Sequence, residues 1–322
     1  VLNIDNMTYA ATEGSVRDVA NSSRYELAKV DIADAEAAEE VLASLRPAAG
    51  MLLAAESHVD RSIDGPDAFI NTNVLGTMHL LQSARRNLDR IDDPSGFRFL
   101  HVSTDEVFGS LGPDEAAFDE STPYSPRSPY SASKASSDHL VRAWHETYGL
   151  PVVITNCSNN YGPFHFPEKL IPLVTLKAVA GESPPVYGTG DNIRDWLFVE
   201  DHAAALVAAV ERGTVGDTYL VGGNAERTNL EVVETICDLV DARLGERSGG
   251  PRRHLIEFVT DRPGHDARYA VDSSKLQREL GWAPSVAFEE GLARTVDWYL
   301  ANNWWWRPIQ EGTYDLGRLG TT

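Results

Sequence analysis

The sequence predicts an α/β fold: a doubly wound parallel sheet, with a smaller α/β lobe interleaved into the C-terminal part of the chain. Two observations support this prediction. Apolar runs of strand length alternate with helix-like stretches from the first residue, which is typical of βαβ units whose parallel strands are buried on both faces. Beyond Gly162 the pattern becomes mixed, with turns rich in proline and glycine between shorter elements, and this indicates a second lobe.

The expected elements follow in order along the chain. Strands are expected at VLNI, YELAKV, GMLLAA, FRFLHVS and VVIT, with helices such as Ala33 to Leu45 and Ala68 to Leu88 between them. Returns to the sheet are expected near residues 195–222, at WLFVED and GDTYLV. The predicted domains are a dinucleotide-binding domain over residues 1–160 with those returns, and a ligand-binding lobe over residues 161–194 and 223–322.

The run VLNID looks like the second strand of a Rossmann-type dinucleotide-binding fold. It ends in Asp5, the acid that would hold the ribose hydroxyls and repel the extra phosphate of NADP, so NAD is expected. The glycine-rich turn of such a fold lies roughly 20 residues before this acid. The first βα unit is therefore missing from this numbering. Either it lies outside the numbering or the chain lacks it; we favour the former, because a sheet without its central strand should not fold well.

Composition restricts the class of protein. With 322 residues, 42% of them hydrophobic, the chain can bury a large core. Its net charge of −20 argues against a nucleic acid or an anionic membrane as partner, since both require a basic face. Cys157 and Cys237 fit no metal-binding or redox spacing, so no metal is expected. Few cysteines and no apolar run of membrane-spanning length indicate the cytoplasm.

The stretch SPYSASKASSDHL has the features of a helix start. Ser128 can cap the helix, Pro129 suits its first turn, and Gly149 can end it. Tyr130 and Lys134 then share one face, which continues as an apolar stripe expected to pack on the sheet, through Ser137, Val141, Trp144 and Tyr148.

Tyr130 and Lys134 have two interpretations. A nearby lysine cation favours the phenolate and lowers the pKa of a tyrosine, so Tyr130 could accept a proton from a hydroxyl near neutral pH. The alternative is a packed tyrosine beside a solvated lysine, which is commoner for an isolated Tyr-x-x-x-Lys pattern. The remainder of the chain has to decide between them.

The strand FRFLHVS runs directly into Thr104, Asp105 and Glu106, at the carboxyl end of a strand, where open α/β sheets bind their ligands. A solvated acidic turn is an alternative in a chain with 48 acidic residues. Two adjacent carboxyl groups become useful when their environments separate their pKa values, one staying protonated as an acid and the other ionised as a base. Such a separation fits an elimination reaction.

Six motifs of the chain, together with Thr104 and the Tyr130/Lys134 pair, resemble the dTDP-glucose 4,6-dehydratase family of extended short-chain dehydrogenases/reductases. They are HVSTDEVFG, SPYSASKASSDHLVRAWHETYGLP, TNCSNNYGP, PEKLIPL, IRDWLFVEDH and DRPGHDARYAVD. The resemblance runs from Val1 to about Tyr299, and the tryptophans 304–306 of the unmatched tail are expected to pack on the body. It implies NAD as cofactor, dTDP-glucose as substrate, and a homodimer formed through two long helices per subunit, one of them the Tyr130 helix.

The resemblance also implies roles for the candidate residues. Tyr130, assisted by Lys134 and Thr104, would take the proton from the glucosyl O4 while hydride passes from C4 to NAD. Glu106 would then remove the C5 proton, and a protonated Asp105 would protonate the departing C6 hydroxyl. NADH would return its hydride to C6, so that the cofactor ends as it began.

The binding residues implied by the resemblance form two sets. Those assigned to NAD, besides Tyr130 and Lys134, are Asp5, Asn6, Met7, Thr8, Asp31, Ile32, Leu53, Ala54, Ala55, Ser57, Thr72 and Asn160. Those assigned to the nucleotide sugar are Ser57, Thr104, Asn159, Lys169, Leu170, Arg194, Asn229, Arg262 and His265. Without the resemblance, we would expect Arg194 to pair with Asp191 or Asp195.

The chain departs from the family at Phe108, where a tyrosine is usual, and a change in hydrogen bonding without loss of the reaction is expected there. Three rival functions stay open. A sugar-nucleotide 4-epimerase or decarboxylase would use the same threonine, tyrosine and lysine, but would not need both Asp105 and Glu106. A GDP-mannose dehydratase fits STSE better than the STDE found here. A non-catalytic dinucleotide-binding protein is the rival from another class.

Overall fold

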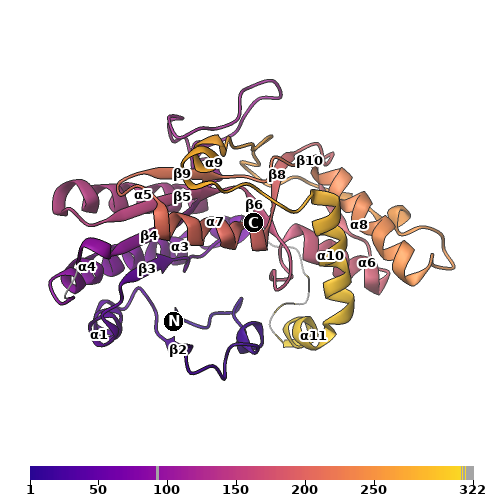
Figure 1. Ribbon diagram of the computed structural model, residues 1–322. Coiled ribbons are helices and arrows are strands. Elements are labelled where there is room, and N and C mark those ends of the chain that lie inside the picture. The colour runs from indigo at the N-terminus through magenta and orange to yellow at the C-terminus, as the bar shows by residue number, and fades with distance from the viewer. Residues whose placement is uncertain (92–93, 313, 315, 317–322) are drawn as a thin grey trace.

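All five strands expected in the first half of the chain are present in the computed structural model, which describes residues 1–91, 94–312, 314 and 316 (Figure 1). They are β1 (Leu2–Asp5), β2 (Glu26–Lys29), β3 (Ala49–Leu52), β4 (Arg98–Thr104) and β5 (Val152–Cys157). The connecting helices are α1 (Ala35–Leu45), α2 (Val59–Asp64), α3 (Pro66–Phe69), α4 (Thr77–Leu88) and α5 (Pro129–Tyr148), with a π-helical segment at Ile70–Gly76 between α3 and α4. The alternating pattern thus predicted the βαβ arrangement correctly.

The parallel sheet is divided into two pieces. One contains β1 and β2, and the other has the strand order β3-β4-β5-β9, where β9 is Thr218–Val221. Every pair in these two pieces is parallel. In the described part of the chain no ladder joins β1 to β3, and Leu53, just past the end of β3, is 57% exposed. The described chain therefore contains two separate parallel pieces.

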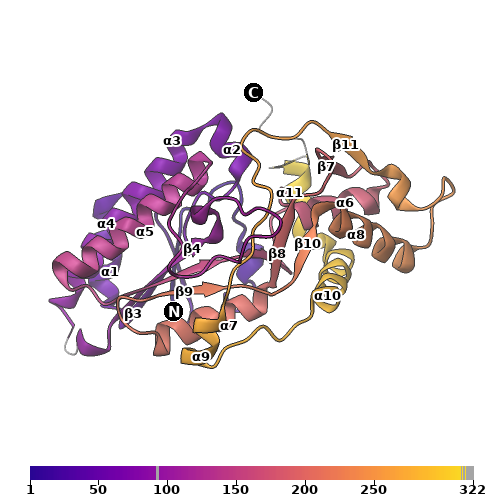
Figure 2. The same cartoon turned by 90° about the horizontal axis from the view of Figure 1, so that it is seen from above.

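Helices cover both faces of the four-stranded piece. On β4, Phe99 packs in the core under α1, α4 and α5, whereas its neighbour Leu100 packs on the opposite face with α7 (Val199–Arg212) and α9 (Ser274–Leu280). This alternation is the two-residue period of a strand buried on both sides. Figure 2 shows α4 and α5 side by side and α7 beyond the sheet. The carboxyl ends of the strands stay uncovered by these helices and face the second lobe.

Helix α5 begins and ends as the sequence predicts. Ser128 accepts the backbone N–H of Ser131, Pro129 occupies the first turn, and Gly149 closes the helix in the left-handed conformation at φ 69°. The predicted apolar stripe is correct only in part. Tyr148 is 46% exposed and lies under the guanidinium of Arg85 instead of packing on the sheet.

The second lobe is built on a separate sheet of order β10-β8-β6. Its strands are β6 (Asn159–Tyr161), β8 (Ile193–Phe198) and β10 (Glu226–Thr228), and its helices are α6 (Leu170–Ala180), α8 (Asn229–Leu244) and α10 (Phe288–Ala301). A further pair consists of β7 (Pro185–Tyr187) and β11 (Glu257–Val259). The expected return to the main sheet near residues 195–222 therefore needs correction: β9 returns, but β8 does not, because its neighbours are β6 and β10.

The C-terminal helix α11 (Asn303–Gly312) packs on the body, as expected for the tryptophan cluster. Trp305 is 3% exposed and donates a hydrogen bond from Nε1 to Ser15 Oγ at 3.0 Å. Arg17 lies over the ring of Trp304, 3.7 Å from its centroid. The end of the chain thus contacts the segment that follows β1. Among the described residues, no helix has both the length and the apolar character of a membrane span.

Candidate active site

The turn after β4 places two carboxyl groups beside a threonine hydroxyl. Thr104 Oγ1 accepts the backbone N–H of Glu106 at 3.2 Å and donates to Asp105 Oδ1 at 3.2 Å. This arrangement caps the single helical turn Asp105–Phe108 and fixes all three residues relative to one another. Asp105 is buried, at 2% exposure, and its Oδ2 has no hydrogen-bond partner within the described chain. The segment from Thr104 to Glu106 is therefore not a solvated acidic turn.

The environments of the two carboxyl groups differ. Burial raises the pKa of Asp105 well above its ordinary value, and the nearby charges of Glu106 and Asp195 raise it further. Burial also raises the pKa of Glu106, but three cations, from Arg262, Arg194 and Lys169, oppose that rise. A protonated Asp105 beside a more readily ionised Glu106 is the separation that acid and base roles require.

The predicted lowering of the pKa of Tyr130 is wrong for the protein without bound ligands. Burial raises it well above the ordinary value, and the charge of Glu106 raises it further, while a hydrogen bond with the Thr104 side chain lowers it. The ring is 8% exposed and packs with Val59 and Phe69. The spacing in the sequence placed Lys134 on the same helix face as Tyr130. It carried no information about burial, which has the largest effect on the pKa of Tyr130.

Lys134 is also buried, at 4% exposure, and donates from Nζ to the carbonyl oxygen of Val102 on β4 at 2.8 Å. Burial lowers its pKa, whereas the charges of Asp138 and Cys157 act in the opposite direction. Lys134 is therefore not a solvated lysine beside a packed tyrosine. Its ammonium group is held inside the protein, near the end of the strand that carries Thr104.

A first cavity lies at the carboxyl ends of β1, β2 and β3. Its lining includes ten of the residues assigned to NAD: Asp5, Asn6, Met7, Thr8, Asp31, Ile32, Leu53, Ala54, Ala55 and Thr72. Asp5 Oδ1 accepts the backbone N–H of Met7 at 2.7 Å, and Asp31 Oδ2 accepts from Asn6 at 2.8 Å. Within the described chain, the other oxygen of Asp5 has no hydrogen bond. A strand-end carboxylate beside small alanines fits a dinucleotide ribose.

Four residues assigned to NAD lie outside this cavity. Ser57 lines the second cavity, and Tyr130 and Lys134 belong to the buried site described above. Asn160 donates to Cys157 Sγ at 3.3 Å and to the carbonyl of Ser158 at 3.0 Å. The consecutive residues Glu56 and Ser57 line different cavities, so the two cavities are neighbours.

A second cavity lies between the lobes. Besides Glu106, it collects eight of the nine residues assigned to the nucleotide sugar: Ser57, Asn159, Lys169, Leu170, Arg194, Asn229, Arg262 and His265. The ninth, Thr104, is not part of its wall, and neither are Asp105 and Tyr130. Residues from both lobes thus meet in one cleft, as the resemblance implied.

The cations of the cleft are held in place by the protein. Arg262 donates from Nη1 to Asp60 Oδ1 at 2.8 Å, whereas its buried Nε has no partner in the described part of the chain. Lys169 donates from Nζ to the carbonyl of Ser57 at 2.6 Å. His265 Nδ1 lies 2.7 Å from Asp261 Oδ1. The unpaired N–H of Arg262 is a donor available to an anionic ligand.

Arg194 does not form the local ion pair that the residue pattern suggested. It is 5% exposed, donates from Nη2 to the carbonyl of Asp266 at 2.9 Å, and lies 4.2 Å from the centroid of the Tyr269 ring. Asp195 instead accepts the backbone N–H groups of Gly223 and Ala225. Arg194 is therefore a buried cation, directed into the cleft by the backbone of the second lobe.

Sequence reasoning missed three residues that line the cleft: Asp60, Glu168 and Tyr187. Asp60 accepts from Tyr187 at 2.9 Å as well as from Arg262. Glu168 accepts from Tyr9 at 3.0 Å and from Arg61 at 2.9 Å. Their partners are distant in sequence, so local spacing carried no signal for them.

Comparisons with known proteins agree with this geometry. A family model described as GDP-mannose 4,6 dehydratase matches residues 1–295. A dTDP-glucose 4,6-dehydratase of Neisseria meningitidis serogroup B is 55% identical, covering 100% of this chain and 92% of that protein. One from Xanthomonas campestris pv. campestris is also 55% identical, with the same coverage.

Solved structures show the same relationship. A dTDP-glucose 4,6-dehydratase of Streptomyces venezuelae, solved with NAD bound, superposes with a TM-score of 0.87 at 42% identity, over 96% of this chain and 90% of that one. An NAD complex of the Bacillus anthracis enzyme gives 0.84 at 42% identity, with the same coverage. The UDP-glucose 4-epimerase of Thermus thermophilus gives 0.81 at 25% identity, over 94% of this chain and 91% of that one.

The fold, the strand-end acid and the buried tyrosine and lysine on one helix face define an extended short-chain dehydrogenase/reductase. Within that class, the chain belongs to the dTDP-glucose 4,6-dehydratase family.

Proposed function

We propose that the protein is an NAD-dependent hydro-lyase that converts dTDP-glucose to dTDP-4-keto-6-deoxyglucose. The observation that carries the proposal is the pair Asp105 and Glu106, two adjacent carboxyl groups in different electrostatic environments, of which Glu106 lines the cleft between the lobes. An elimination needs both an acid and a base, and this pair supplies them. The 55% identity to enzymes named for this reaction supports the substrate.

In this proposal, Tyr130 accepts the proton of the glucosyl O4 hydroxyl. The hydrogen bond between Thr104 and Tyr130 aligns the phenol and lowers its pKa. Lys134, buried one turn further along the same helix face, would supply a positive charge that favours the phenolate. Because burial raises the pKa of Tyr130 in the protein without ligands, the phenol must release its own proton to solvent when cofactor and substrate are bound, and the resulting phenolate then accepts the proton of O4. NAD, held in the first cavity, would accept the hydride of C4 and later return it to C6.

Glu106 and Asp105 then act on the 4-keto sugar. The keto group acidifies the C5 hydrogen, which Glu106 removes as general base. Asp105, whose pKa burial raises well above its ordinary value, donates its proton to the leaving C6 hydroxyl, and water departs. The cations of Arg262, Arg194 and Lys169 keep Glu106 more readily ionised than burial alone would allow.

The diphosphate of the substrate requires cations, and the second cavity supplies them in a chain of net charge −20. We assign the diphosphate to Arg194 and Arg262 as cations and to His265 as a neutral imidazole, because burial lowers the pKa of His265 to about 4. The free Nε–H of Arg262 supports this assignment, since a guanidinium binds phosphate oxygens through paired N–H groups.

Incubation with NAD and dTDP-glucose in deuterated water, followed by mass spectrometry of the sugar, tests the proposed function. The expected product has lost one water and carries one deuterium at C5, because the C5 proton leaves and a solvent deuteron replaces it. A 4-epimerase would return a sugar without loss of water, and a non-catalytic protein would return the substrate. Either result would overturn the proposal.

We also propose a homodimer in which α4 and α5 of the two subunits meet. These helices pack side by side within one subunit, and Leu75 and Tyr148 expose apolar surface at 40% and 46%. Light scattering of the purified protein would give twice the mass of the chain. The two free cysteines, Cys157 and Cys237, support a reducing compartment, for which we propose the cytoplasm.

A further inference from the structure

The proposed mechanism gives no role to Asp138, whose carboxylate is buried on the same face of α5 as Tyr130 and Lys134. Its side chain is fully buried, and it lies on α5 one turn beyond Lys134, as Lys134 lies one turn beyond Tyr130. Three functional side chains of one helix thus occupy successive turns of one face. A buried carboxylate is costly unless it is paired and hydrogen-bonded, so its partners indicate what it does.

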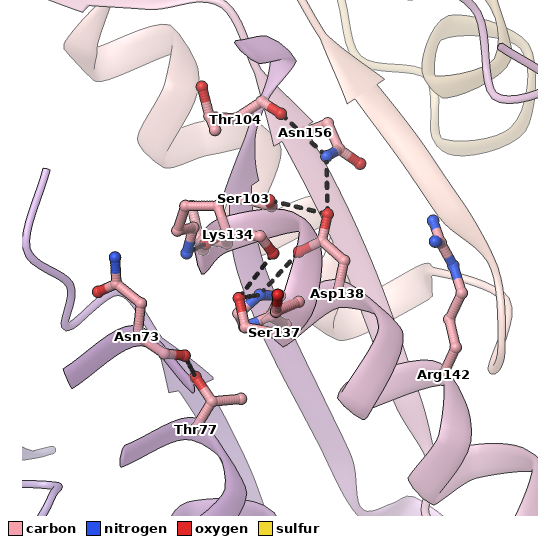
Figure 3. A network of polar contacts seen from close by, with 12 residues as sticks. Asn73, Thr77, Ser103, Thr104, Lys134, Ser137, Asp138, Arg142 and Asn156 are labelled. Carbon is pink, nitrogen blue, oxygen red and sulfur yellow. Dashed lines mark hydrogen bonds and ion pairs between the residues drawn. The ribbon is translucent and has the colours of Figure 1, made fainter. Parts of the chain in front are cut away.

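Four side chains donate hydrogen bonds to this carboxylate, at donor–acceptor distances of 2.8 to 3.2 Å. They are His101 and Ser103 from β4, Asn156 from β5, and Tyr124 from the loop before α5. Figure 3 shows the bonds from Ser103 and Asn156. Hydrogen bonds of this kind hold the pKa of Asp138 below its ordinary value, although burial alone would raise it. Asp138 is therefore an anion inside the protein.

The same contacts connect Asp138 to the catalytic turn. Ser103 immediately precedes Thr104, and Asn156 also donates to the Thr104 carbonyl oxygen at 3.0 Å. Lys134 donates to the carbonyl of Val102, one residue earlier on β4. The end of β4 is thus attached to α5 at four consecutive residues, His101 to Thr104, three of them through the Asp138 carboxylate.

Besides attaching β4 to α5, Asp138 has a second role, which the charges around it indicate. His101 is kept neutral, because burial lowers its pKa and the nearby Lys134 cation lowers it further. Arg142, one turn further along α5, reaches Asp138 only through the hydroxyl of Tyr124, to which it donates at 2.9 Å. Lys134 is thus the buried cation that faces this anion. Burial disfavours the ammonium form of Lys134, and Asp138 compensates for that cost.

We propose that Asp138 is a positioning residue of the active site: its carboxylate keeps Lys134 protonated and, through Ser103 and Asn156, holds Thr104 against the Tyr130 helix. This inference rests on the proposed function only for its kinetic consequence, because the charge of Lys134 can be measured without turnover. Without the anion, Lys134 loses its proton at lower pH, and Tyr130 loses the cation that favours proton transfer.

The experiment compares Asp138→Asn with Tyr124→Phe. The first variant removes the charge at nearly constant shape, and the second removes one hydrogen bond to the same oxygen but leaves the charge. The pKa of Lys134 is measured by NMR of protein carrying ¹³C-labelled lysine. We expect it to fall by about one pH unit or more in Asp138→Asn and to stay unchanged in Tyr124→Phe.

The pH dependence of kcat provides the second measurement. In Asp138→Asn, the loss of activity on the alkaline side should begin at lower pH by the same interval, whereas Tyr124→Phe should keep the wild-type profile. An unshifted Lys134 pKa in Asp138→Asn overturns the inference. If wild type shows no turnover, the proposed function fails, and the NMR titration still decides the role of Asp138.

Loss of folding is handled separately. Circular dichroism and thermal unfolding establish whether each variant is folded, and Asp138→Ser, which leaves room for water in place of the carboxylate, serves as a second neutral variant. A wild-type Lys134 pKa below about 7 would overturn the inference without any variant, because Asp138 would then not keep the ammonium protonated.

Discussion

Arg262 donates a hydrogen bond to Asp60 at 2.8 Å, although 202 residues separate them in sequence. Asp60 lies in α2, between β3 and α4, and Arg262 belongs to a loop of the second lobe. Asp60 is buried and Arg262 is half-buried in the cleft wall. One ion pair thus orients a candidate phosphate ligand and joins the two lobes.

Arg262→Lys should weaken binding of dTDP by about tenfold or more, since lysine keeps the charge but cannot offer the planar pair of N–H groups. Isothermal titration calorimetry gives the affinity. Arg243→Lys is a matched control, because Arg243 forms a similar fork with Asp297 on the surface at 2.7 Å. Equal affinities of both variants would contradict the phosphate role of Arg262.

Glu106→Gln and Asp105→Asn should stop the reaction at different stages. Without the base, reduced nicotinamide should accumulate and no deuterium should enter at C5. Without the acid, deuterium should enter at C5 while water loss slows by about 10²–10⁴-fold. Nicotinamide absorbance and mass spectrometry of the sugar follow the two steps. The same stage of arrest in both variants would contradict the separate roles.

The raised pKa of Asp105 predicts a pH-dependent stability difference. Above the ordinary value of 3.8, the unfolded chain releases this proton while the folded chain retains it, so wild-type stability falls as the pH rises. Asp105→Asn has no such proton, and its stability relative to wild type should increase by up to about 1.4 kcal/mol per pH unit in that window. Urea denaturation at several pH values measures this difference, and a constant difference would refute the raised pKa.

Tyr130 should remain a neutral phenol at neutral pH when no ligand is bound, because burial raises its pKa. A difference spectrum between wild type and Tyr130→Phe should therefore show no phenolate absorbance below about pH 10. Phenolate from Tyr130 near pH 7 would show instead that Lys134 outweighs burial. Turnover by Tyr130→Phe should fall by about 10²–10⁴-fold.

Trp305→Ala should destabilise the protein by about 3–5 kcal/mol, because the side chain is buried in the C-terminal cluster. Tyr148→Ala provides the comparison, since Tyr148 is 46% exposed and should cost about 1 kcal/mol or less. Urea denaturation of both variants measures the two costs. Similar losses in the two variants would mean that α11 contributes little to the fold.

The sequence predicted the features that depend on local pattern. Apolar runs located β1 to β5, and Ser128 and Gly149 located the two ends of α5. It predicted less well what depends on pairing between distant segments. The run WLFVED has the pattern of any buried strand, and only the short partners β6 and β10 decide that it forms a separate sheet.

The candidate site also combines features that local pattern reports with features that it does not. The motifs assigned Arg194, Arg262 and Lys169 to one substrate site, and all three line one cleft. The direction in which the pKa of Tyr130 shifts depends on burial, which sequence spacing does not report. Phe108 illustrates a smaller case. Its ring packs with Phe118 and Tyr124, at 5.1 Å between centroids in both pairs. The ring that lacks the usual hydroxyl is therefore part of a buried aromatic cluster.

The contact between Trp305 and Ser15 has a consequence for biosynthesis. Ser15 lines the first cavity, and 290 residues separate it from its partner. During translation, the ribosome must therefore release α11 before this wall of the cavity acquires its packing. The nascent chain should therefore complete this wall of its dinucleotide cavity only after α11 has emerged from the ribosome.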